Sequence, residues 1–69
     1  MDNLAPIFRR ILAIEQERIA ELVSDLAAMK GKRGDEWKTA RAILRNEIAM
    51  AKWSASGTEA LAVAHERSL

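Results

Sequence analysis

Three groups of residues in this sequence carry side chains that could do chemistry: one histidine, two glutamates within apolar stripes, and a row of cations. His65 is the candidate base, because histidine alone titrates near neutral pH without a perturbing environment. It lies four residues before the end of the chain, where we expect a surface or helix-capping role. Gly31-Lys32 lacks the full spacing of a phosphate-binding loop. We therefore assign no catalytic residue and expect no enzyme activity.

The two glutamates, Glu15 and Glu47, fall on apolar stripes, and facing carboxylates inside a helical bundle can bind metal. The di-iron pattern also requires Glu-x-x-His on two helices, and the sequence contains no such motif and no cysteine. We therefore expect no metal and no cofactor. The favoured interpretation pairs Glu15 with Arg18 or Lys52, and Glu47 with Arg18, as polar contacts that fix helix register.

A row of cations follows one face of the second expected helix and the turn before it: Lys30, Lys32, Arg33, Lys38, Arg41, Arg45 and Lys52. Cations so arranged can follow the phosphate backbone of a nucleic acid. The cations could instead form ion pairs with acidic residues of the first helix, because Glu21 would lie level with Arg45. Asp25 would likewise lie level with Arg41, so internal pairing could neutralise the row. We favour a solvated or internally paired row and keep nucleic-acid binding as the alternative.

These side chains are positioned by an all-α fold, which we predict as one domain over residues 1–69. The expected elements are a helix over about residues 3–30, a turn over 31–34, a second helix over about 35–53 and a short third helix over about 57–67. Asn3 can cap the first helix, and Gly31 can end it with a positive φ. Asp35 is the expected cap of the second helix. Ser56 and Glu59 have the spacing of a capping box for the third.

The first two helices are predicted to pack as an antiparallel hairpin, because their connection is short. The apolar stripe of the first helix contains Ala5, Phe8, Leu12, Glu15, Ile19, Leu22, Leu26 and Met29. The stripe of the second contains Trp37, Ala40, Leu44, Glu47 and Ala51, widened by Ile43 and Ile48. Folding at the turn then sets Met29 near Trp37, Leu26 near Ala40 and Leu22 near Leu44.

A second apolar row remains on the first half of the first helix, and one antiparallel partner helix cannot cover so wide an arc. Trp53 also lies off the main stripe of its helix. We expect the third helix to cover Trp53 with Leu61 and Val63; the alternative is an exposed interface anchor. The third helix offers too little apolar surface for the row as well. The candidate partner-binding residues are therefore Leu4, Ile7, Ile11, Ile14 and Trp53.

Size and composition indicate a small helical domain whose own core gives it little stability. The chain has 69 residues, a net charge of +1 and no cysteine, so it lacks the strong positive charge of a dedicated nucleic-acid binder. Single cores below roughly 70–80 residues seldom supply more than about 3–5 kcal/mol. We therefore expect a homodimer that resembles a four-helix bundle.

The function predicted from these features is that of a non-enzymatic protein-interaction module. Such a module would act as an adaptor, a co-chaperone or an inhibitor by docking an apolar helix face on a larger protein. The alternative is a nucleic-acid-binding regulator that uses the basic edge of the second helix. The sequence predicts no signal peptide and no membrane span, so we expect a cytoplasmic location without a membrane partner.

Overall fold

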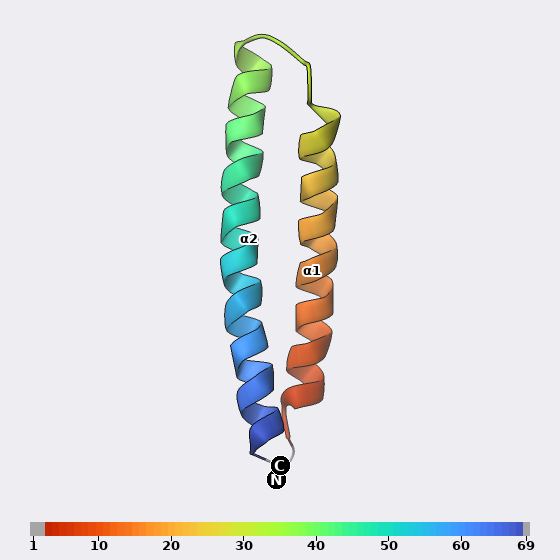
Figure 1. Ribbon diagram of the computed structural model, residues 1–69, viewed down its shortest axis with the longest axis vertical. Helices are drawn as coiled ribbons and strands as arrows, with labels where there is room; N and C mark the ends of the chain where they lie inside the picture. Colours follow the sequence, from red (N-terminus) through yellow and green to blue (C-terminus); the bar gives the residue numbers. More distant parts are fainter. Residues whose placement is uncertain (1–2, 69) are drawn as a thin grey trace.

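The computed structural model describes residues 3–68, which form two long antiparallel helices (Figure 1). Helix α1 runs Ala5–Ala28 and helix α2 runs Asp35–Arg67. The hairpin is a narrow rod with principal extents of 55 × 14 × 13 Å, and the described residues contain no strand. The prediction of an all-α antiparallel hairpin is therefore confirmed. The predicted domain also includes residues 1–2 and 69, which lie outside the described residues.

The ends of α1 are set by residues in and just beyond its first and last turns. Asn3 Oδ1 accepts a hydrogen bond of 2.8 Å from the Ala5 N–H, and Pro6 occupies the first turn, where a missing N–H breaks no helical bond. The Asn3 side-chain amide also donates to the His65 carbonyl at 2.8 Å, which ties the start of α1 to the end of α2. After α1, Gly31 has a φ of 83°, a conformation that glycine adopts without steric cost.

Helix α2 is longer than the sequence predicts. Asp35 is its first residue and Gly34 takes the N-cap position, so the predicted cap by Asp35 is wrong by one residue. The helix continues through Ser54-Ala55-Ser56-Gly57 to Arg67, so the predicted break and separate third helix are also wrong. Within residues 3–68, neither helix combines the length and the apolar character needed to cross a membrane.

The inner stripe of α2 explains this continuity. Its buried or half-buried positions 48, 51, 55, 58, 62 and 65 alternate steps of three and four residues without a change of phase. They therefore face α1 along its whole length, as in a heptad seam. A break at 54–57 would uncover the N-terminal half of α1, so packing overrides the low helix propensity of serine and glycine there.

The core is a single seam between the two helices. Its buried residues are Ala5, Leu12 and Leu22 from α1, and Ile48, Ala55 and Ala62 from α2. Half of them are alanines, which remove little apolar surface from water. The seam is therefore narrow, and many large apolar side chains stay outside it.

The register of the two helices differs from the predicted one by about one helical turn. The Arg41 guanidinium reaches the Met29 carbonyl at 3.3 Å, so Met29 lies level with Arg41 and not with Trp37. The connection is longer than predicted, and the first turns of α2 extend beyond the end of α1 (Figure 1). Trp37 lies in this overhang and is 40% exposed. Ile48 is buried at the inner position that the prediction gave to Glu47.

Candidate functional site

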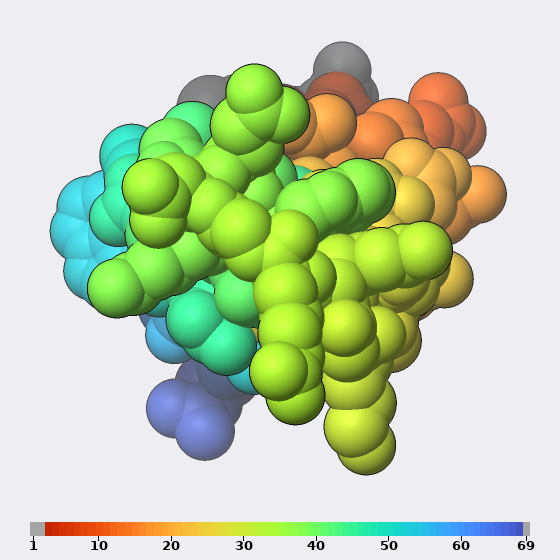
Figure 2. Space-filling view, turned by 90° about the horizontal axis from the view of Figure 1, so that it is seen from above, coloured from red at the N-terminus to blue at the C-terminus, as the bar shows by residue number. Residues whose placement is uncertain are grey.

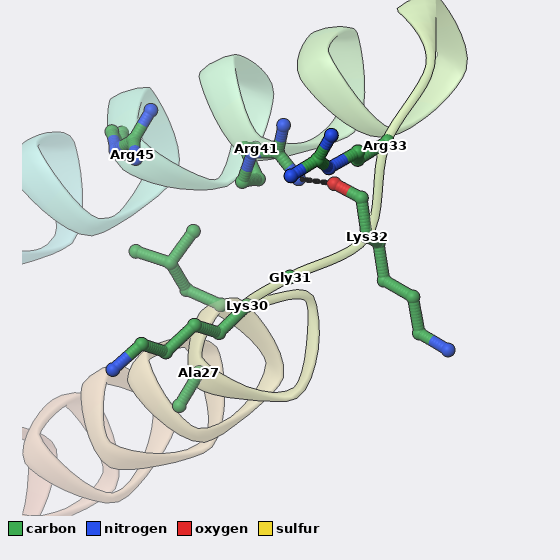
Figure 3. Close-up of a pocket in the computed structure, with 8 residues that line it drawn as sticks. Ala27, Lys30, Gly31, Lys32, Arg33, Arg41 and Arg45 are labelled. Carbon is green, nitrogen blue, oxygen red and sulfur yellow. Dashed lines mark hydrogen bonds between the residues drawn. The ribbon is translucent and has the colours of Figure 1, made fainter.

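The turn end of the hairpin carries an open hollow of about 450 Å³ that is lined by cations. Five cations, termed the basic cluster below, line it: Lys30, Lys32, Arg33, Arg41 and Arg45. Figure 2 looks down onto this end and shows the long side chains of the turn projecting from the rod. In Figure 3, the three arginines lie along one side of the hollow and Lys30 along the other, while the Lys32 ammonium points away from them.

Arg41 fixes the geometry of this cluster. Its Nη1 donates a hydrogen bond of 2.8 Å to the Lys32 carbonyl and one of 3.3 Å to the Met29 carbonyl. The last carbonyls of a helix lack partners within the helix and carry partial negative charge, so a cation is favourable there. Arg41 therefore caps the end of α1 and holds the turn against α2.

The basic cluster has no carboxylate within ion-pair distance among residues 3–68. The ion pair found in this part of the chain joins Arg9 to Glu66 at the opposite end of the rod. Glu21 and Asp25 project from the flank of α1 opposite to that of Arg9, and Lys30 follows the helix in the connection. Of the two outcomes favoured for the row, internal pairing with Glu21 and Asp25 does not form among the described residues, and the cations other than Arg41 are exposed to solvent.

The structure brings together most, but not all, of the predicted cations. Lys38 and Lys52 are exposed on α2 and do not line the hollow. Lys30, which the sequence also places in the row, lines the hollow from the connection just after α1. The Lys32 ammonium lies 5.9 Å from the centre of the Trp37 ring, a cation–π contact at the edge of the cluster.

The ion pair at the terminal end of the rod marks one flank of the hairpin. Arg9 Nη2 donates to Glu66 Oε1 at 2.6 Å, and Arg9 Nε donates to Glu66 Oε2 at 2.9 Å. This hydrogen bonding lowers the pKa of Glu66 and raises the pKa of Arg9. The two side chains are 43% and 42% exposed, so solvent screens the pair and its effect on stability is small.

The flank opposite that ion pair carries the predicted apolar row, which α2 leaves uncovered. The exposed fractions are 40% for Leu4, 52% for Ile7, 41% for Ile11 and 62% for Ile14. Leu61 of α2 is 49% exposed and joins them. Leu61 comes one position before the buried Ala62, just as Ile11 comes one position before the buried Leu12. In two antiparallel helices, residues that come one position before an inner residue lie on the same side of the pair. These five exposed residues are termed the apolar face.

Trp53 is 82% exposed, so the predicted cover by Leu61 and Val63 is wrong. The reason is the continuity of α2: its last turns run straight on, and no segment of the described chain folds back. Trp53 instead lines a shallow groove with Gly57 and Leu61, because residues four and eight positions on lie on the same side of a helix. Its role as an interface anchor stays a prediction.

Glu15 occupies an inner position of α1 and is half-buried. Ser54 Oγ donates a hydrogen bond of 2.6 Å to Glu15 Oε2, and the hydroxyls of Ser54 and Thr58 lower the pKa of Glu15. The predicted ion pairs of Glu15 and Glu47 with nearby cations do not form among the described residues. Residues 3–68 also contain no group of three or more side chains placed to hold a metal ion.

The fold and its surfaces define a helical hairpin with an apolar face near its termini and a basic cluster at its turn. No family model, no curated protein and no solved structure matches the chain. The candidate sites therefore rest on the geometry of the chain itself.

Proposed function

We propose that this chain is a non-enzymatic protein-interaction module that acts through its apolar face, and that a second copy of the chain docks there. The observation that carries the proposal is the exposure of five large aliphatic side chains on one flank. Full burial of a leucine or isoleucine is worth roughly 1.5–3 kcal/mol relative to exposure. Association at this face would add the apolar burial that the narrow seam lacks. A role as adaptor, co-chaperone or inhibitor would use the same docking chemistry.

The spacing of the row favours a second copy as the occupant. The four side chains of α1 are separated by three, four and three positions, so the row is the same in both directions. Consider two copies of α1 related by a two-fold axis between Ile7 and Ile11. Ile7 would then lie opposite the partner's Ile11, and Leu4 opposite the partner's Ile14. An interface of this kind is self-complementary, as closed dimers require.

Charge favours the same antiparallel arrangement. Beyond the row, the same flank carries Arg18, Glu21 and Asp25 on α1 and Glu47 and Met50 on α2. Two parallel copies side by side would oppose these carboxylates across the interface, and such like-charge contacts are unfavourable. Pairing about the row instead directs the two turn ends away from each other.

Replacing Ile7 and Ile14 with serine tests the proposal. We expect the wild-type chain to be a dimer at micromolar concentration in size-exclusion chromatography with light scattering. The variant Ile7→Ser/Ile14→Ser should be a monomer with unchanged helical circular dichroism, because both side chains are already exposed within one hairpin. Ile43→Ser is the matched control: Ile43 is 58% exposed but lies outside the apolar face, so this variant should remain a dimer.

Three results would overturn the proposal. A wild-type chain that stays a monomer with a cooperative thermal transition would exclude self-association. Loss of helical signal by the double variant, starting from a monomer, would show that the row belongs to the core. Equal weakening of the dimer by Ile43→Ser would place the interface elsewhere.

A further inference from the structure

We propose that the basic cluster binds the phosphate backbone of a nucleic acid. This site is separate from the apolar face, because it lies at the turn end of the rod, whereas the apolar face lies toward the termini (Figure 1). The cluster combines cations from two parts of the chain: Lys30, Lys32 and Arg33 of the connection, and Arg41 and Arg45 of α2.

The charge of the cluster is only partly compensated within the chain. Arg41 is directed at the carbonyls of Met29 and Lys32. The side chains of Lys30, Arg33 and Arg45 are exposed and donate no hydrogen bond to another residue among those described. Cations held this close repel one another, and anions that enter the hollow relieve the repulsion. Phosphate groups supply the required charge at regular spacing.

Contacts within the chain hold the turn in one conformation without a ligand. Arg41 joins α2 to the connection through its contacts with the Met29 carbonyl at the start of the connection and the Lys32 carbonyl near its middle. Gly31 turns the chain in the left-handed region without strain. Little backbone freedom is therefore lost on binding, which favours affinity.

The width of the rod sets what the cluster can contact. The hairpin measures 14 × 13 Å across, whereas the major groove of B-form DNA is about 12 Å wide and admits one α-helix or a two-stranded β-ribbon. The cluster draws its cations from the connection as well as from α2, so no single helix carries all of them into that groove, and the cations would contact phosphates and sugars. Such contacts position a protein without specifying sequence. We therefore expect binding that is independent of base sequence and steeply dependent on salt.

Two triple variants of the full-length chain test this site. Lys30→Gln/Arg33→Gln/Arg45→Gln removes three cations of the cluster whose side chains make no hydrogen bond among the described residues and keeps Arg41, which holds the turn. The matched control is Arg10→Gln/Arg18→Gln/Arg67→Gln, which removes the same charge from exposed positions outside the hollow. The probe is a short fluorescein-labelled duplex of random sequence, prepared as DNA and as RNA. Binding is measured by fluorescence anisotropy at salt concentrations from about 50 to about 200 mM.

We expect the wild-type chain to bind the duplex at about 50 mM salt and to release it as salt rises. The cluster variant should bind roughly tenfold or more weakly, with a salt slope shallower by about 2–3, since each phosphate contact contributes about 0.9 to the slope. The control variant should change the slope by less than about 1. Equal losses in both variants would overturn the site, because they would reflect net charge alone. Absence of wild-type binding to both duplexes at low salt would overturn it as well.

Discussion

Arg41 illustrates how one residue of a charged cluster can serve the fold, although its neighbours face solvent. Its guanidinium is half-buried and donates to two main-chain carbonyls, whereas Lys30 and Arg45 are exposed. The carbonyls it satisfies belong to the end of α1 and the turn, where helical partners are missing. Among neighbouring cations on one face, the burial of each side chain decides its role. A half-buried cation supports the turn, and an exposed one presents its charge to a ligand.

The first residue-scale prediction concerns Arg41→Gln. We expect this variant to lose about 1 kcal/mol of unfolding free energy, the typical net worth of an intramolecular hydrogen bond. For a domain of this size, that loss lowers the Tm by roughly 4–8 °C. Circular dichroism melting would measure it. Arg45→Gln is the control and should leave the Tm nearly unchanged, because Arg45 makes no hydrogen bond among the described residues. Equal Tm values for the two variants would contradict the capping role of Arg41.

At the scale of elements, Gly57 is the least expected residue in α2. It lies inside a helix of 33 residues, where glycine costs about 0.8–1.0 kcal/mol relative to alanine. A Cβ atom built at this position meets no other atom within 4 Å, so packing inside the chain does not require glycine. The helix tolerates this cost because the residues around Gly57 keep the seam with α1 in phase.

The second prediction follows from this position. Gly57→Ala should raise the unfolding free energy by about 1 kcal/mol and the Tm by roughly 4–8 °C. Gly31→Ala is the matched control with the opposite sign, because Gly31 has a φ of 83° and a Cβ is strained there. Thermal melts of both variants provide the measurement. A lower Tm for Gly57→Ala would mean that the chain breaks at this glycine and that α2 is not continuous.

The helix ends could be predicted from sequence where local chemistry and packing agreed. Asn3, Pro6 and Gly31 bound α1 close to where their types predict. The segment 54–57 has equally clear break signals, yet α2 passes through it. Propensity differences there total about 1–2 kcal/mol. Loss of the seam against Leu12 would cost more, since removing one large core side chain typically costs about 2–5 kcal/mol.

The side of the helix on which each candidate surface lies could be predicted from the sequence, whereas the register of the two helices could not. Helical periodicity alone places the apolar row on one flank and most of the cations on another, and the exposures agree with that separation. Register could not be predicted in the same way. A slip of α2 by one turn keeps every inner position in phase, so Met29 fits the apolar pattern beside either Trp37 or Arg41. Only the length of the connection decides between them.

At the scale of the whole molecule, the hairpin separates two kinds of surface along one rod 55 Å long. The apolar face lies toward the termini, and the basic cluster surrounds the turn (Figure 1). A partner at one end leaves the other end accessible. Pairing of two copies through the row would therefore produce a longer rod with a basic cluster at each end, suited to bridging two segments of nucleic acid.

The last prediction tests that arrangement by distance. The chain contains no cysteine, so Thr39→Cys provides a single labelling site on the exposed side of α2 near the turn. In the antiparallel dimer, each label lies more than twenty helical residues from the two-fold axis, so at 1.5 Å per residue the two labels should be roughly 65 Å apart. Parallel copies would bring them within about 30 Å, because packed helices lie about 8–10 Å apart. Electron–electron double resonance on the spin-labelled dimer distinguishes the two arrangements. A short distance would contradict antiparallel pairing about the row, and adding Ile7→Ser/Ile14→Ser to the labelled chain should abolish the dipolar signal altogether.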